Sequence, residues 1–490
     1  MTTTGEPPIT ADQAAPVTTS PERALDAPRS YPVLRWLVAA TFTVILNETI
    51  MVNAIPRLMA QFEVSARAAQ WLSTAFMLTM AVVIPVTGWF LQRVTTRTAF
   101  TVAMSVFGAG TVIAMAAPVF PVLVAGRVVQ AAGTAVMLPL LMTTLMTVVD
   151  ERDRGRVMGN VTLAISVAPA MGPALSGAVL AVASWRWLFG VVLPVVALVA
   201  VVGLRRLTNV GETHVSRIDW PSVALAALGF GGLVYGLSRI GEARPGALPA
   251  WVWVTGGAVV VAGFVLRQRR LTRRSEPLLD LRTLAHRTYA LSLLLQSIAF
   301  LAMLGAMILL PLYLQDLRGL SPLQTGLLVA PGGLAMGLLG PVVGRIFDRV
   351  GGRPLMIPGA FGVLAALVAL SRVGESTPYV LLLLVQVLLM VSLAALFTPT
   401  FTLGLGALPA NLYSHGSSLL GTSQQVSAAV GTALTVTVLS WRSTALTAQG
   451  AGESAAYVGG VQAAFGVSAV LAVGIVVVAF LLPNRPEPVK

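Results

Sequence analysis

The chain has 490 residues, of which 56% are hydrophobic and only 10% are charged, with a formal net charge of +13 and a mean hydropathy of +0.83. Long apolar segments recur from Val33 to Leu482, which excludes an ordinary soluble domain and indicates an all-α polytopic membrane protein. There is no cysteine, and the three histidines are far apart, so we expect no disulfide, no thiol chemistry and no metal site.

The first residues differ in composition from the rest of the chain. Residues 1–30 are rich in Thr, Pro and Ala and carry four acidic residues, a composition typical of a disordered soluble tail. They contain no basic region near their start and no cleavage site, so we expect no signal peptide. We therefore expect a disordered cytoplasmic tail over 1–32 and a short cytoplasmic tail over 483–490.

Fourteen apolar stretches lie between the two tails, and an even number places both termini on one side of a membrane. With the termini inside, 23 of the 32 Lys and Arg residues fall on the inner side and 8 on the outer side, while Arg127 lies within a span. The positive-inside rule then predicts cytoplasmic termini in a cell membrane. The predicted spans are 33–55, 69–91, 99–117, 121–147, 157–182, 187–204, 220–238, 249–266, 288–311, 323–343, 355–371, 379–402, 416–440 and 461–482.

Two copies of one loop pattern indicate an internal repeat. The segment from Gly88 to Arg97 follows the second span, and the similar segment from Gly344 to Arg353 follows the tenth. This spacing predicts two six-helix bundles over 33–204 and 288–482, with two linker helices and a basic cytoplasmic loop over 205–287. Parallel repeats of this kind predict a substrate site at the midplane between the halves. The arginines of the basic loop are expected to anchor it near anionic lipid, so we predict no nucleic-acid partner.

The first span contains Glu48, the only acidic residue deep within an apolar stretch. A carboxylate there costs about 2.5–3.5 kcal/mol on insertion scales, so it should face the protein interior or a wet cavity. It could be a structural acid that is hydrogen-bonded between helices, or a proton or cation site, and we favour the second interpretation. Thr41 lies seven residues earlier on the same helix face and could line the same cavity.

The fourth span contains Arg127, in a stretch that continues to Gln130 and Gly133. An arginine inside a span needs partners, and this span runs inward, so Arg127 should lie at about the depth of Glu48. Its guanidinium could pair with Glu48 or bind backbone carbonyls of the first helix, and the sequence does not choose between them.

The fifth span contains small residues and prolines at a spacing of four. Pro169, Pro173 and Gly177 form one series, and Ala168, Gly172 and Ser176 form the adjacent one. Two neighbouring faces of small residues would allow another backbone to approach closely, and the prolines would bend the helix.

Together these motifs resemble the major facilitator superfamily, in its fourteen-span drug–proton antiporter branch (the EmrB/QacA type), over about residues 33–482. The resemblance implies the major facilitator fold, with two six-helix bundles plus two inserted linker helices. It also implies that the Gly-Pro pattern of the fifth span is the family's antiporter motif, found in exporters. In the first span the family commonly has an acid where this chain has Asn47, and Glu48 follows one residue later, about 100° around the helix.

The resemblance further assigns a gating role to the repeated loops, where an acid beside arginines would lock two helix ends. The C-half loop is complete in Gly344, Asp348, Arg349, Gly351 and Arg353. The N-half loop keeps Gly88, Arg93 and Arg97 but has Gln92 in place of the acid and Thr95 in place of the second glycine. Because Gln92 cannot form the ion pair, we expect a weaker or differently built gate there.

We predict a proton-coupled antiporter that exports lipophilic small molecules by alternating access, as a monomer in the lipid bilayer, with no cofactor besides the proton gradient. The alternatives are a proton-coupled symporter or facilitator for a metabolite, and a non-transporting membrane scaffold or sensor. An enzyme is not expected, because no catalytic Ser-His pair, metal cluster or phosphate loop is found. One membrane acid favours monocationic, zwitterionic or neutral substrates over divalent cations. Candidate cavity residues are Thr41, Trp71, Tyr313, Gln315, Gln424 and Gln425.

Overall fold

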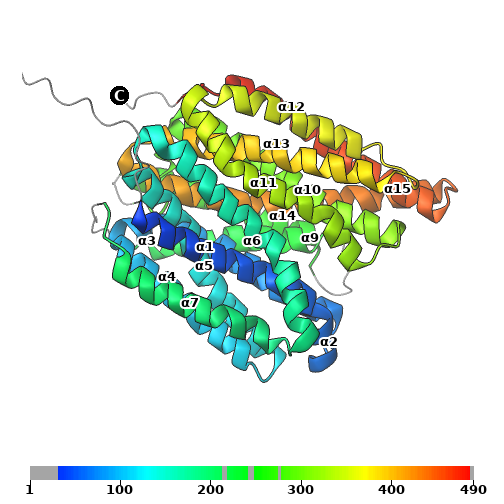
Figure 1. The fold of residues 1–490 in the computed structure, drawn as a ribbon, viewed down its shortest axis with the longest axis horizontal. Helices are drawn as coiled ribbons and strands as arrows, with labels where there is room; N and C mark the ends of the chain where they lie inside the picture. Colours follow the sequence, from blue (N-terminus) through cyan, green and yellow to red (C-terminus); the bar gives the residue numbers. More distant parts are fainter. Residues whose placement is uncertain (1–30, 212–217, 241–247, 274–276, 486–490) are drawn as a thin grey trace, which may run out of the picture. The chain divides into compact units, whose positions relative to one another are not determined.

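The computed structural model describes residues 31–211, 218–240, 248–273 and 277–485, so the predicted N-terminal tail lies almost entirely outside the described residues. Within these ranges the chain forms α-helices and no strand, and the long helices run side by side (Figure 1). They are α1 (Pro32–Ile50), α2 (Ile55–Phe62), α3 (Ala66–Arg93), α4 (Thr96–Ala116), α5 (Phe120–Val148), α6 (Arg154–Val182), α7 (Arg186–Arg206), α8 (Trp220–Ser238), α9 (Ala250–Thr272), α10 (Arg287–Leu312), α11 (Pro322–Val350), α12 (Arg353–Leu370), α13 (Tyr379–Gly406), α14 (Tyr413–Ala448) and α15 (Glu453–Leu481).

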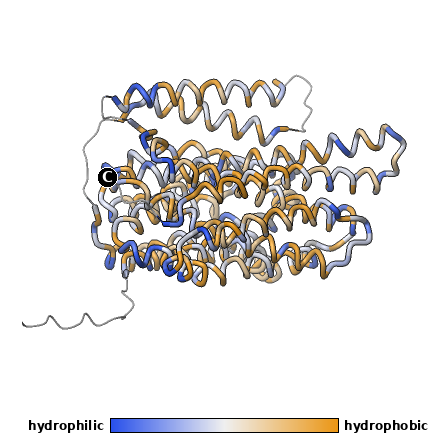
Figure 2. Tube along the Cα trace, turned by 90° about the horizontal axis from the view of Figure 1, so that it is seen from above, coloured by the Kyte–Doolittle hydropathy of each residue, from blue (hydrophilic) through white to orange (hydrophobic). Residues whose placement is uncertain are grey.

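Each predicted span overlaps one long helix. Among the described residues, 13 helices are long and apolar enough to cross a membrane. The exception among the long helices is α14, which has 36 residues but carries many Ser, Thr and Gln side chains. Hydrophobic residues follow the helices along their length and hydrophilic ones gather toward their ends (Figure 2). The fold class is therefore confirmed, and a fourteenth crossing by α14 stays a prediction.

The first span ends earlier than the sequence predicted. The α-helix stops at Ile50, a 3-10 turn follows over Met51–Ala54, and α2 then begins at Ile55. The cause is Pro56, which has no N–H to donate and whose ring clashes with the carbonyl four residues earlier. Glu48 therefore lies in the last turn of α1 rather than well inside a longer helix.

Local capping sets several helix starts. Ser65 accepts a hydrogen bond from the backbone N–H of Ala68, and Thr95 accepts one from Thr98. Ser321 and Gln324 form a reciprocal capping box at the start of α11. Each cap satisfies N–H groups that a helix start otherwise leaves without partners. The cap at Thr95 also explains why the N-half loop has a threonine where its C-half counterpart has Gly351.

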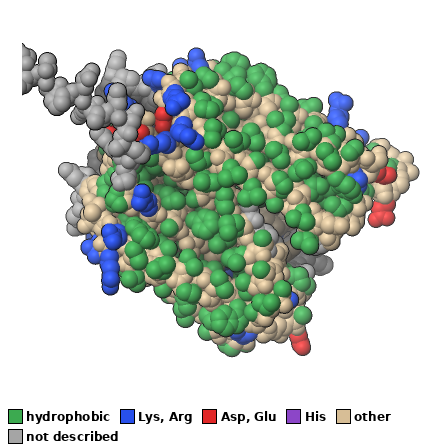
Figure 3. All heavy atoms as spheres, in the orientation of Figure 1, with side chains coloured by type: hydrophobic (Ala, Val, Ile, Leu, Met, Phe, Trp, Pro, Cys, Tyr) green, Lys and Arg blue, Asp and Glu red, His purple; other side chains and the backbone are tan. Residues whose placement is uncertain are grey.

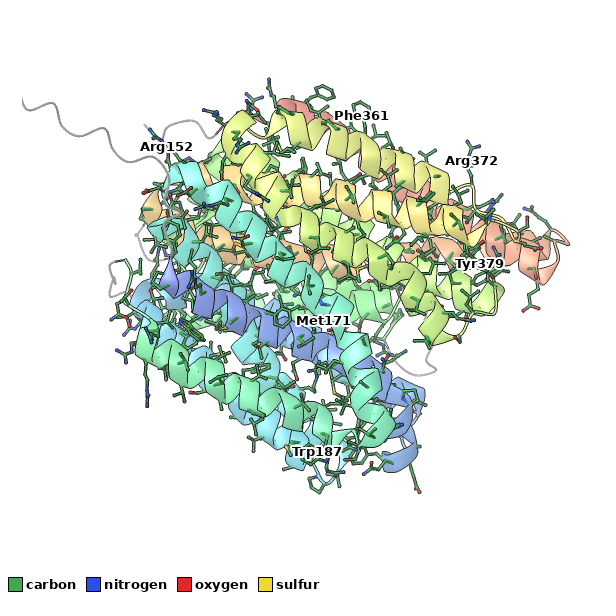
Figure 4. The ribbon with its side chains drawn as sticks, viewed as in Figure 1. Arg152, Met171, Trp187, Phe361, Arg372 and Tyr379 are labelled. Atoms are coloured by element: carbon green, nitrogen blue, oxygen red, sulfur yellow. The ribbon has the colours of Figure 1, made fainter. Side chains whose placement is uncertain are left out.

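Contacts between the two six-helix halves include those of α5 with α14 and of α6 with α13. The halves meet most extensively along two helix pairs, α6 with α11 and α3 with α14. Both pairs are closely packed toward one end of the helices, which we call the basic end because it carries Arg93, Arg152, Arg205, Arg269 and Arg349. Figure 4 shows Arg152 at this end and Arg372 and Tyr379 at the opposite end. In the view of Figure 3, hydrophobic side chains cover most of the face between the two ends.

Glycines bring the backbones of α6 and α11 together at the basic end. A Cβ atom added at Gly340 would lie 2.6 Å from the carbonyl oxygen of Gly159, and one added at Gly344 would lie 2.7 Å from the carbonyl carbon of Gly155. Real Cβ atoms do not approach so closely, so only glycine fits these positions. The basic end of this pair is therefore closed in the structure.

The α8–α9 hairpin packs against both α3 and α14, and so contacts both halves. The amide of Gln268, which is fully buried, ties it together. Its Oε1 accepts from the backbone N–H groups of Leu278 and Leu279 at 2.8 and 3.2 Å, and its Nε2 donates to Ser222 Oγ at 2.7 Å. The linker is thus a folded part of the bundle.

Asp219, just before α8, also joins the two helices of this hairpin. It accepts two hydrogen bonds of 2.7 Å from Arg267 of α9. The hydrogen bond from Arg267 lowers the pKa of the Asp219 carboxyl below its usual value. A carboxyl whose pKa falls on folding stabilises the protein above its unfolded pKa of about 4, and that stabilisation is lost as the pH falls through the folded pKa. We expect Asp219→Asn to cost about 0.2–1 kcal/mol at neutral pH and nothing below the folded pKa, because the pair is part-exposed. Thermal unfolding in detergent between pH 3 and 7 would measure this, and an equal cost at both pH values would contradict it.

Candidate functional site

Glu48 lies in the last turn of α1 and is partly exposed, whereas its neighbour Asn47 is only 1% exposed. Among the described residues, the Glu48 carboxylate has no direct ion pair and no hydrogen bond, and the Asn47 Nδ2 has no partner either. The two adjacent side chains therefore have different surroundings, as expected from one step around the helix. The acid occupies the more open position.

The face of α6 that carries Gly172 packs directly on α1 beside Glu48. A Cβ added at Gly172 would lie 2.8 Å from the Cβ of Thr49 and even closer to its hydroxyl. Thr49 Oγ1 donates to the carbonyl oxygen of Leu46 at 3.0 Å, so its hydroxyl is held in place. The predicted close approach of a second backbone is thus found at Gly172, one residue from the acid.

Only one of the two predicted small-residue faces of α6 is packed. Ala168, Gly172 and Ser176 are buried, but Gly177 has open space where a Cβ would lie and Pro169 is partly exposed. No other element of the described structure comes within 4 Å of a Cβ added at Gly177, so the close approach that this face would allow is not seen there. The helix continues through Pro169 and Pro173, and the side chain of Pro173 lies outside the described part of the structure.

Arg127 on α5 is 1% exposed and bonds to neither of the two partners that the sequence left open. Its guanidinium donates to Gln130 Oε1 at 3.1 Å and lies over the ring of Phe76 at 4.2 Å, while its Nε has no partner. Gln130 in turn donates to Thr111 Oγ1 at 2.9 Å. Arg127 and Glu48 interact as opposite charges without direct contact. The Glu48 carboxylate is therefore not directly paired with Arg127.

The C-half gating loop bonds across the two halves through Asp348. Its carboxylate accepts from the backbone N–H groups of Gly155 at 2.8 Å and Arg156 at 2.7 Å, in the first turn of α6. An acid at this position satisfies the free N–H groups and the positive end of the helix dipole. Asp348 thus joins the end of α11 to the start of α6, with backbone N–H groups as the hydrogen-bond donors. The role of this contact as a lock stays a prediction.

In the N-half gating loop, Gln92 contacts the other half through neutral groups. Gln92 Nε2 donates to the carbonyl oxygen of Asn411 at 2.8 Å, immediately before α14. Gly88 faces the same helix, where an added Cβ would lie 3.0 Å from His415 Nδ1. The loop therefore does form a contact between the halves, but one without the charge that Asp348 supplies.

The predicted cavity residues do not share one site. Tyr313 is fully buried and donates to the carbonyl oxygen of Gly374 at 2.6 Å, and Gln315 is exposed beyond the end of α10. Trp71 packs on the ring of Tyr235 in α8 at 6.0 Å. Tyr313 and Gln315 lie in a π-helical turn at the end of α10, and Trp71 lies near the start of α3, so the three are not gathered in one place. Their contact with a substrate stays a prediction.

The remaining cavity candidates lie within the helices. Thr41 is 1% exposed, and its Oγ1 has no hydrogen-bond partner within the described part of the chain. Gln424 is mostly buried in α14, and Gln425 beside it is partly exposed. None of these observations establishes contact with a substrate, so the three positions stay predictions.

Two hydroxyl pairs that join the halves were not predicted from the sequence. Thr143 and Ser417 lie 2.8 Å apart, and Thr162 and Thr398 lie 3.0 Å apart. Isolated Thr and Ser residues are common in membrane helices, and each usually bonds to its own helix backbone, so no local pattern marks these four.

Comparisons with known proteins identify the family. The chain matches the model of the Major Facilitator Superfamily over residues 37–432. It is 37% identical over 452 residues to YcnB of Bacillus subtilis, an MFS-type transporter, with 92% of this chain and 95% of that protein covered. It is also 37% identical over 442 residues to the lincomycin resistance protein LmrB of Listeria monocytogenes, with 89% and 93% covered.

The fold is shared with solved structures as well. The human organic anion transporter MFSD10 superposes with a TM-score of 0.66 at 13% identity, covering 91% of this chain and 99% of that one. These findings confirm the predicted fold class and the resemblance to the major facilitator superfamily, while membership of the fourteen-span antiporter branch stays a prediction. The chain is a multi-span membrane protein that belongs to the Major Facilitator Superfamily of transporters.

Proposed function

We propose that the protein is a proton-coupled antiporter that exports lipophilic small molecules from the cell by alternating access. The observation that carries this proposal is the surroundings of Glu48. This partly exposed acid lies in a membrane helix, and its carboxylate has no bonded partner among the described residues. The adjacent residue, Thr49, contacts Gly172. Burying an ionisable side chain inside a membrane costs free energy, so such a residue is a functional site by default. The names of relatives, which include lincomycin resistance proteins and a multidrug resistance protein homolog, support drugs as the substrate class.

The coupling mechanism follows from competition for one carboxylate. Glu48 is protonated from the outside, which releases the substrate, and it loses the proton toward the cytoplasm before the next substrate binds. Because Gln130 and Phe76 hold Arg127, the carboxylate is left available for a proton or a substrate. A ligand shifts the two-state equilibrium only by its differential affinity for the states, and here the proton and the substrate favour opposite steps.

The gate in this proposal is the contact between the halves at the basic end. With Gly155 and Gly159 of α6 packed on α11 and Asp348 bonded to the start of α6, that end is closed. Opening it requires these groups to separate as one half rocks against the other. With both termini cytoplasmic, the closed end faces the cytoplasm.

Inside-out membrane vesicles test the direction and the coupling. We expect lincomycin to accumulate in the vesicles when their lumen is made acidic, and a protonophore to abolish the accumulation. A symporter would instead accumulate it when the external solution is more acidic, and a scaffold or sensor would take up nothing in either case. Either of those results would replace the proposal.

The charge moved in each cycle provides a further prediction. With Glu48 as the single coupling acid, about one proton enters for each substrate that leaves. Exchange for a monocation then moves no net charge, while exchange for a neutral substrate moves one positive charge inward and gains about 2.3 kcal/mol per 100 mV. At constant pH difference, we expect membrane potential to change the transport of neutral substrates and not that of monocations. Potassium and valinomycin would clamp the potential, and a strong voltage effect on a monocation would require a second coupling group.

A further inference from the structure

The segment after α15 holds the C-half gating loop through Asn484. Its Oδ1 accepts from the backbone N–H of Arg353 at 3.0 Å, and its Nδ2 donates to the carbonyl oxygen of Val350 at 3.0 Å. Its own carbonyl oxygen accepts from the N–H of Gly352 at 2.7 Å. One side chain and its backbone thus bond to both sides of the turn that links α11 to α12.

The contact with Asn484 requires a glycine at position 351. Its φ of +88° lies in the region that favours glycine, and an added Cβ would lie 2.5–2.6 Å from the carboxamide atoms of Asn484. Any side chain at position 351 would therefore strain the turn and displace Asn484. The second glycine of the loop motif has a structural reason that the sequence alone did not show.

The N-half gating loop has the same arrangement. Asn209 follows the last helix of its half, α7, and its Oδ1 accepts from the backbone N–H of Arg97 at 3.2 Å. Next to it, Val210 exchanges two hydrogen bonds with Thr96 Oγ1, at 3.1 and 3.3 Å. Arg97 and Arg353 occupy matching positions of the two loop motifs, so both asparagines bond to the same backbone group.

The match extends to the sequence. Asn209 lies three residues beyond Arg206, the end of α7, and Asn484 lies three residues beyond Leu481, the end of α15. The segments read Leu207-Thr-Asn209 and Leu482-Pro-Asn484. A Leu-x-Asn segment thus follows the last helix of each half at the same distance. In both halves its asparagine accepts a hydrogen bond from the same position of the loop, so this contact is repeated within the fold.

We propose that Asn209 and Asn484 are positioning residues that fasten the two gating loops to the last helix of each half, and that Asn484 thereby keeps Asp348 on the start of α6. Asp348 lies three residues before Gly351, in the last turn of α11, so the turn held by Asn484 fixes the end of the helix that carries the acid. The two asparagines differ in consequence, because the N-half lock at Gln92 is neutral and the C-half lock at Asp348 is charged. Asn484 therefore has the larger effect on closure of the basic end.

A single cysteine can report that closure, since the natural chain has none. Thr398 on α13 is fully buried against Thr162 of α6, so Thr398→Cys reacts with a maleimide only when the halves separate at the basic end. In purified full-length protein carrying this reporter, we expect Asn484→Ala to speed alkylation about three- to tenfold, the equivalent of one or two lost hydrogen bonds. Gly351→Ala should do the same, Asn484→Asp should stay within about twofold of the parent because it keeps the acceptor, and Asn209→Ala should have a smaller effect than Asn484→Ala.

The decisive comparison uses Asp348→Ala as the background. If Asn484 acts by positioning Asp348, Asn484→Ala adds less than about a twofold change once the acid is gone, because the two losses are not additive. An unchanged alkylation rate in Asn484→Ala and Gly351→Ala, or the same fold-change with and without Asp348, would overturn the proposal. This inference rests on the proposed alternating access, but the labelling needs no substrate and no proton gradient, so its failure is distinguishable from a failure of proton-coupled export.

Discussion

Glu48→Gln is expected to insert into the membrane and fold as the parent does, while its proton-driven efflux falls to the level of vesicles that lack the protein. Gln keeps the volume of the side chain and loses only the group that titrates. Since Glu48 is the one acidic residue within the fourteen apolar stretches of the sequence, no other acid in those stretches can replace it. Efflux driven by a pH gradient in inside-out vesicles measures this directly.

A matched control and a second assay make the result specific. Glu453→Gln removes an exposed acid in the first turn of α15 and should leave efflux unchanged. Exchange of labelled for unlabelled substrate needs no proton and should persist in Glu48→Gln. Loss of exchange as well would place Glu48 in substrate binding, and undiminished proton-driven efflux would remove it from coupling altogether.

Gly172→Leu is expected to abolish efflux with the protein still present in the membrane. Even the first carbon of a side chain at this position collides with Thr49, so α1 and α6 must move apart beside Glu48. Overpacking of a close contact costs about 1–3 kcal/mol, and small-residue interfaces in membranes depend on such close approach. Growth inhibition by lincomycin and immunodetection in membrane fractions would give activity and abundance together.

Gly177→Leu is the control that the same helix provides. It belongs to the same Gly-Pro pattern, but its Cβ would enter open space, so we expect at least half of the parent efflux. Normal transport by Gly172→Leu would show that the α1–α6 contact is incidental. Equal loss in both variants would mean that the pattern acts through helix flexibility rather than through this contact.

The fold could be predicted from the sequence because burial in a membrane demands long apolar helices, and the repeat of the loop motif marked the two halves. Glu48 and the face of α6 at Gly172 were also predictable, since an acid in an apolar run and a series of small residues are local patterns. The two lie side by side in the structure, because Thr49, the residue after Glu48, contacts Gly172. Local chemistry therefore identified the central part of the candidate site.

The partners of those residues could not be predicted, because they come from distant parts of the chain. Arg127 lies over Phe76 of another helix, and Asp348 bonds to an N–H group 193 residues away. Only Gln130, which accepts from Arg127, is close in sequence, three residues further along the same helix. Tyr313 looked like a cavity residue because an aromatic side chain with a hydroxyl suits either role. Its hydrogen-bond partners Gly374 and Arg318 depend on how α10 ends.

Proton movement driven by a substrate gradient tests the coupling through Glu48 most directly. Proteoliposomes that contain the protein would be loaded with lincomycin and a pH-sensitive dye at equal internal and external pH, then diluted into substrate-free buffer. As lincomycin leaves, we predict that the lumen becomes acidic by about one proton per substrate molecule, and that Glu48→Gln shows no such change. Substrate loss without a pH change, an alkaline shift, or equal acidification in Glu48→Gln would contradict antiport through this carboxylate.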